Sequence, residues 1–254
     1  MDGESNGGGA PFLIRLALPD RRGTLAHVAG TLAAHGVDIL RVEVVGSGNG
    51  VVVDDLLLAG GDVDASLAEL GRNANLIGRR EHAELPDPGL AMAGALAKIT
   101  GAPSLGAARH AIVTAALELV AADAGVLLRD AGHGWLRPVA ATSESLPPIR
   151  QRQASLARAA LGRGTAQIAA PGDEWAPPQY QAALGRGCVL AVPAGVPPFV
   201  VLDVVRHDGF PYVEAETERL RALLLVAVGT LHALGDRVVR APDGASARLL
   251  EAHR

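Results

Sequence analysis

Residues 12–45 read FLIRLALPDRRGTLAHVAGTLAAHGVDILRVEVV, and their pattern indicates the fold of the first part of the chain. Residues 12–18 are apolar apart from one arginine and predict a strand, and the turn residues Pro19–Gly23 follow it. From Thr24 the apolar residues recur at helical spacing until Gly36, a residue typical of helix ends. Residues 37–45 return to strand character.

The next thirty residues repeat this order. Asn49-Gly50 is a strong hairpin signal and joins residues 37–45 to a return strand at 51–58. Asp62 can cap a second helix, and a last strand runs through Asn75–Arg79. The order β-α-β-β-α-β predicts a ferredoxin-like sheet with both helices on one face.

We expect the other face of this sheet to be partly covered. Strict alternation places Ile39 and Val45 on one side of the second strand together with Arg41 and Glu43. A face of this mixed character suits contact with a partner subunit or a neighbouring domain.

Two phrases give this region a family resemblance. Asp20-Arg21-Arg22-Gly23-Thr24-Leu25 opens the first helix and Gly36-Val37-Asp38-Ile39 opens the second strand. Together with Val53-Asp54-Asp55-Leu56 they resemble an ACT domain, which implies an amino-acid-binding regulatory module. Arg22 stands where many members have proline, a departure that bears on ligand preference.

The residues themselves describe such a site. Gly23 allows a ligand to approach the backbone, and the amides that begin the helix favour a carboxylate. The ammonium group of an amino acid could then pair with Asp20 or Asp38. An ordinary turn with a purely structural role is the alternative. The candidate ligand-binding residues are Asp20, Arg21, Arg22, Gly23, Thr24, Leu25, Asp38 and Ile39.

The second part of the chain alternates helices and strands in a different order. Ser104 can cap a helix over 104–122. Strands are expected at 124–129, 135–141, 165–169, 187–193 and 199–206, with a helix at 151–162, a proline-rich loop at 171–180 and a closing helix from Val213 to Leu234. This order, with Gly134–Ala141 and Val189–Pro193, resembles a GAF domain. The resemblance implies an antiparallel sheet flanked by helices and a small-molecule pocket.

Composition excludes several classes of function. The net charge is −4, with 23 basic residues that form no patch, so we expect no direct nucleic-acid binding. The single cysteine, Cys188, rules out an intrachain disulfide and argues against the two-cysteine chemistry of GAF-type methionine sulfoxide reductases. The eight histidines show no metal spacing, and no nucleophile or acid–base motif is found. We therefore expect no cofactor, no metal and no enzyme activity.

The start of the sequence, MDGESNGGGA, lacks the features of a signal peptide, and no stretch is apolar enough to span a membrane. The expected compartment is the cytoplasm, without membrane contact. The predicted organisation is α+β, with a disordered leader (1–10), an ACT-like domain (11–85), a linker (86–103), a GAF-like domain (104–238) and a peripheral tail (239–254).

These observations predict a non-catalytic regulatory sensor that binds a small metabolite, an amino acid at the ACT-like domain, and forms a homodimer. A regulatory protein is a further expected partner. One alternative is an adaptor that binds partner proteins without a ligand, and another is a nucleotide or other small molecule in the GAF-like domain. The apolar stripe Leu220, Leu223, Leu224, Val228 and Leu231 of the closing helix suits either a dimer interface or the core of its own subunit.

Overall fold

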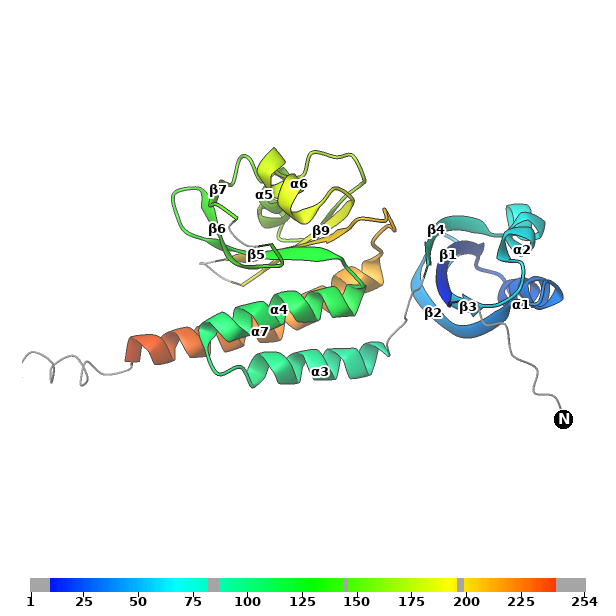
Figure 1. The fold of residues 1–254 in the computed structure, drawn as a ribbon, viewed down its shortest axis with the longest axis horizontal. Helices are drawn as coiled ribbons and strands as arrows, with labels where there is room; N and C mark the ends of the chain where they lie inside the picture. Colours follow the sequence, from blue (N-terminus) through cyan, green and yellow to red (C-terminus); the bar gives the residue numbers. More distant parts are fainter. Residues whose placement is uncertain (1–9, 82–86, 144–145, 196–198, 241–254) are drawn as a thin grey trace, which may run out of the picture.

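The computed structural model describes residues 10–81, 87–143, 146–195 and 199–240 (Figure 1). The expected leader, apart from its last residue, and the tail beyond residue 240 lie outside these ranges. Within them the chain forms two domains, each with its own sheet.

The first domain has the predicted ferredoxin-like order. Its sheet runs β2-β3-β1-β4, and α1 and α2 pack on one face over the core that includes Ile14, Val28 and Leu56. Its elements are β1 (Phe12–Pro19), α1 (Thr24–Ala34), β2 (Asp38–Gly48), β3 (Val51–Ala59), α2 (Val63–Leu70) and β4 (Asn75–Glu81), with a short 3-10 turn at Gly71–Asn73.

The second domain is built on an antiparallel sheet of order β7-β6-β5-β10-β9-β8. Its elements are α3 (Pro88–Thr100), α4 (Leu105–Val120), β5 (Ala124–Asp130), β6 (Trp135–Ala141), β7 (Ile149–Arg150), α5 (Ser155–Arg163), β8 (Gln167–Ala169), α6 (Pro178–Leu184), β9 (Cys188–Ala194), β10 (Val200–Arg206) and α7 (Glu214–Arg240).

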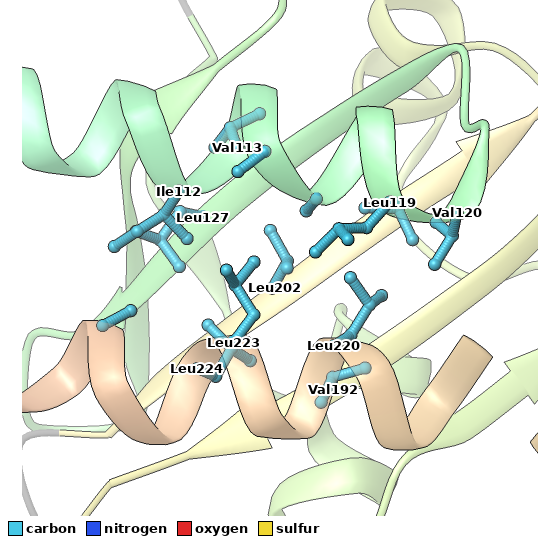
Figure 2. Close-up of a cluster of buried hydrophobic side chains, with 14 of the residues drawn as sticks. Ile112, Val113, Leu119, Val120, Leu127, Val192, Leu202, Leu220, Leu223 and Leu224 are labelled. Atoms are coloured by element: carbon cyan, nitrogen blue, oxygen red, sulfur yellow. The ribbon is translucent and has the colours of Figure 1, made fainter. Parts of the chain in front are cut away.

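Helices cover both faces of this sheet, so that alternate strand residues enter two different cores. Leu127 and Leu202 point toward α4 and α7, as Figure 2 shows. Val126 and Val201 point to the opposite face, where α5 and α6 lie. The strands are therefore apolar on both sides, which explains their near-continuous runs of Val, Leu and Ala.

Three segments differ from the expectations. The stretch assigned to the linker contains α3, whose Ala95 and Ile99 are buried in the core shared with α4 and α7. The segment expected as a proline-rich loop ends in α6, because Pro178 occupies the first helical turn, where proline is favoured. The two-residue strand β7 was not predicted.

The apolar stripe of α7 packs inside its own subunit. Leu220, Leu223 and Leu224 are fully buried against α4 and the sheet (Figure 2). Among the described side chains of α7, the large apolar residues that remain exposed are Leu225 and Val226. The fold therefore supports the interpretation of this stripe as part of the core of its own subunit.

The expected alternation along β2 is wrong. The pairing of β2 with β3 shifts register between Ile39 and Arg41 and again between Val44 and Gly46. Each shift is a β-bulge, which changes the side to which the following side chains point. Ile39 consequently packs with the helices, whereas Glu43 reaches Arg219 of α7 on the other side of the sheet.

The second domain covers the helix-free face of the first sheet. Of the two expected contacts, with a partner subunit or with a neighbouring domain, this is the second. Leu13 and Leu57 of this face pack with Phe210, in the loop that precedes α7. A Cβ at Gly78 in β4 would lie 2.9 Å from the Phe210 ring, so the absence of a side chain there permits the approach.

Buried charges connect the two domains at the centre of this contact. Arg15 of β1 donates from Nε and Nη2 to the two carboxylate oxygens of Asp55 in β3, both at 2.6 Å. Its guanidinium also lies 3.4 Å from the carboxylate of Glu216 in α7. Glu216 pairs in turn with Arg206 of β10 and accepts from the backbone amide of Val213 at 2.9 Å. These four side chains, Arg15, Asp55, Arg206 and Glu216, form what we call the interdomain charge cluster.

Candidate ligand-binding sites

The turn between β1 and α1 holds six of the predicted site residues together. Gly23 is the N-cap of α1 and has φ +88°, a conformation that glycine adopts without strain. A Cβ built on Gly23 meets nothing within 4 Å, so the space beside this backbone is open. Asp20, Arg21, Arg22 and Leu25 are exposed and Thr24 is half-buried.

The start of α1 lacks the side-chain cap found in three other helices. Asp62, Asp87 and Ser104 accept hydrogen bonds from the first amides of α2, α3 and α4. No described side chain does so at α1, and the Thr24 amide bonds instead to the carbonyl of Arg21 at 3.2 Å. A carboxylate placed here would meet amide donors and the positive end of the helix dipole.

The structure separates Asp38 and Ile39 from this turn. Pro19 at the end of β1 pairs with Val51 of β3. Val51 pairs in turn with Gly48 at the end of β2. Ile39 is level with Leu58, which pairs with Phe12 at the start of β1. The two groups of site residues therefore lie at opposite ends of the sheet, roughly 20 Å apart at about 3.3 Å per residue.

The face of the second sheet under α5 and α6 encloses an acidic group. The Asp203 side chain lies among apolar residues, and its Oδ1 has no hydrogen-bond partner among the described residues. Burial raises the pKa of Asp203 to about 7. The indole nitrogen of Trp175, which is buried in the core on this face, likewise lacks a described partner.

Cys188 is a buried core residue of β9. Its thiol donates to the carbonyl of Gly209 at 3.2 Å, and burial raises its pKa, which disfavours the nucleophilic thiolate. Across the residues that the structure describes, no group of three His, Cys, Asp or Glu side chains could hold a metal ion. Within the same ranges no helix is long and apolar enough to cross a membrane.

Sequence reasoning missed the interdomain charge cluster, although the sequence contains a signal for it. Arg15 interrupts the apolar run 12–18, and Arg206 ends the strand 200–205, which is apolar apart from Asp203. A charged residue inside such a strand is rarely buried without a partner. The two arginines therefore indicate buried acidic partners, and a search for such partners could have predicted a contact between the two domains.

Comparisons with known proteins agree with this description. The ACT domain family model matches residues 12–72. No curated protein matches the chain. Among solved structures, the GAF domain of a phosphoenolpyruvate-protein phosphotransferase from Coxiella burnetii is 18% identical, with a TM-score of 0.48 over 59% of this chain and 98% of that one.

Two further structures are similar to this chain. The bacteriophytochrome RpBphP3 from R. palustris is 10% identical, with a TM-score of 0.50 over 78% of this chain and 44% of that one. A free methionine-R-sulfoxide reductase from Neisseria meningitidis is 14% identical, with a TM-score of 0.49 over 61% and 96%. At such identities a likeness concerns the fold alone.

Residues 12–72 of this chain thus match the ACT domain family model, and a domain with the GAF-like fold follows them.

Proposed function

We propose that this protein is a regulatory sensor that binds a free L-amino acid at its ACT domain and does so as a homodimer. The observation that carries the proposal is the uncapped start of α1 behind the open backbone of Gly23. The ligand carboxylate would accept hydrogen bonds from the helix amides, and Asp20 would face the ammonium group.

The dimer is supported by the edge of the first sheet. Among the described strands β2 has no neighbour on its outer side, and Leu40, Val42 and Val44 along it are 56%, 38% and 62% exposed. An exposed apolar edge strand of this length is a template for pairing with another strand. The second domain contacts this strand on the face of the sheet, through Glu43 and Arg219, and leaves Leu40, Val42 and Val44 exposed.

The sequence of this edge is complementary to itself. In an antiparallel pair of β2 strands centred on Val42, Leu40 lies opposite Val44 of the second copy and Arg41 lies opposite Glu43. Such apolar and opposite-charge pairs stabilise antiparallel sheets. The same register brings Asp38 of the second copy opposite Gly46, toward the end of the sheet that holds the Asp20–Leu25 turn. The two groups of site residues would then lie toward the same end of the paired sheets, with β2 and β3 between Asp38 of the second copy and β1.

A thermal-shift screen of the full chain against the twenty amino acids tests the function. A ligand at a hundred times its dissociation constant adds about 2.7 kcal/mol to the stability of the state it binds. We expect one L-amino acid or a related few to raise the melting temperature. Gly23→Val should abolish the shift, because it fills the space beside the backbone, and Asp38→Ala should weaken it.

Gly172→Val is the matched control, because Gly172 also has a positive φ, +93°, and open space around its Cβ position. Val44→Lys should dissociate the dimer in light scattering and remove the shift, whereas Leu225→Lys on α7 should do neither. A screen without any shift would favour the adaptor alternative. A shift with nucleotides that survives Gly23→Val would place the ligand in the GAF-like domain.

A further inference from the structure

A cavity of about 400 Å³ opens between α4, α7 and the sheet of the second domain. Its wall is largely apolar and includes Leu105, Val139, Val200, Val228 and Leu231. It lies on the face covered by α4 and α7, the side opposite α5 and α6. A volume of this size, with apolar walls and a few polar groups, is typical of small-molecule sites.

Two arginines line this cavity, and a third lies in the hollow beside it. Arg129 of β5 and Arg109 of α4 line the cavity, and both also line the adjoining hollow that contains Arg137 of β6. Arg129 and Arg137 are directly opposite each other in the β5–β6 pairing. Burial and the nearby charge of Arg129 lower the pKa of Arg109, as expected where a cation faces another cation.

Within the described ranges, no carboxylate forms an ion pair with Arg109, Arg129 or Arg137. Asp130 also lines the hollow, but its carboxylate accepts a hydrogen bond from the amide of Gly132 at 2.8 Å. By contrast, the interdomain arginines Arg15, Arg80, Arg206 and Arg219 all have acidic partners.

Such an arrangement opposes stability, because like charges directly opposite in a sheet repel each other. Interactions that oppose stability within an otherwise stable fold are expected at functional sites. An oxyanion between the three guanidinium groups would remove the repulsion and could accept paired hydrogen bonds from them. The apolar wall behind the arginines requires that the anion also carry an apolar group.

We propose that this cavity, which we call the arginine cavity, binds an amphipathic small-molecule anion. Its carboxylate or phosphate head is held by Arg109, Arg129 and Arg137. Its apolar portion lies against Val139, Val228 and Leu231, between α4 and α7. This site is separate from the amino-acid site proposed above and does not depend on it.

Isothermal titration of the full chain with four probes tests the proposal: octanoate, octyl phosphate, inorganic phosphate and 1-octanol. We expect saturable binding of octanoate or octyl phosphate at one site per chain, and the better of the two identifies the preferred head group. Inorganic phosphate and 1-octanol should bind at least tenfold more weakly, because each lacks one half of the ligand.

Arg129→Gln and Arg137→Gln should each weaken binding at least tenfold, the effect of losing about 1.4 kcal/mol. Their ligand-free melting temperatures should be equal to or above that of the wild type, because the repulsion is relieved. If either arginine had a purely structural role, its replacement would instead lower the melting temperature of the ligand-free protein. Arg158→Gln, an exposed arginine of α5 on the other face, is the matched control and should bind as the wild type does.

Four results would overturn the proposal. They are no saturable binding of either octyl anion, equal binding of 1-octanol, equal binding of inorganic phosphate, and an equal loss of affinity in Arg158→Gln. Each would show that the arginines and the apolar wall do not act on one ligand.

Discussion

Arg15 of the ACT domain and Glu216 of helix α7 lie 3.4 Å apart, and both side chains are almost completely buried. The pair joins the sheet that carries the proposed amino-acid site to the helix that closes the second domain. Any displacement of the ACT sheet relative to α7 must therefore break a desolvated ion pair, which couples the two domains mechanically.

Removing Arg15 should destabilise the protein severely. Arg15→Met leaves the buried Asp55 carboxylate without its paired donors, and losing one partner of a buried ion pair costs about 3–5 kcal/mol. Urea denaturation measures this loss, with Arg158→Met, an exposed arginine, as the control. A loss below about 1 kcal/mol would mean that the interdomain charge cluster contributes little to stability.

Gly78→Val should separate the domains without unfolding the ACT sheet. The new Cβ would lie 2.9 Å from the Phe210 ring and 3.3 Å from Pro211, in the middle of the interface. We expect calorimetry to resolve two melting transitions in the variant and one in the wild type. Gly162→Val, whose Cβ position is open, should keep a single transition. One transition in Gly78→Val would show that the interface adapts to the added side chain.

Helix α3 should belong to the second domain energetically as well as spatially. Ile99 is fully buried in the core with α4 and α7, so Ile99→Ala should cost about 2–5 kcal/mol. A fragment that begins at residue 87 should likewise be more stable than one that begins at residue 101. Equal denaturation midpoints for the two fragments would return residues 86–103 to the role of a linker.

The stability of the second domain should depend on the ionisation of Asp203. Burial raises the pKa of this carboxyl to about 7 in the folded state, against about 4 in an unfolded chain. The folded state therefore binds more protons between these values, and the free energy of unfolding falls as pH rises through that window and levels off above it.

Asp203→Asn should remove this dependence, because the amide stays neutral. The stability of the variant relative to the wild type should rise between pH 4 and pH 7, by an amount on the order of 4 kcal/mol. Denaturation at several pH values measures it, and Glu174→Gln, an exposed carboxyl, should show no such trend. A pH-independent difference would mean that Asp203 is not the titrating group.

Local sequence signals were sufficient for most of the fold. The turn at Gly23, the Asn49-Gly50 hairpin and the capping residues Asp62 and Ser104 each stand where the structure uses them. The predicted order of the second domain was likewise confirmed, apart from α3 in the expected linker, the unpredicted strand β7, and α6, whose start proline obscured.

What the sequence could not reveal depends on contacts between distant residues. The bulges in β2 are set by its pairing with β3, so alternation alone misplaced Ile39 relative to Glu43. The split of the site between Asp20 and Asp38 follows from strand register, which a linear motif does not contain. The arginine cavity likewise requires Arg109, Arg129 and Arg137 to be brought together from α4, β5 and β6.

The most direct test of the central claim is hydrogen exchange of the full chain with and without the amino acid that the thermal-shift screen identifies. We expect slower exchange at the backbone amides of residues 22–26, where the ligand carboxylate would bind. We also expect slower exchange along β2, where the copies would pair. Binding that leaves the amides of residues 22–26 unchanged would contradict the proposal.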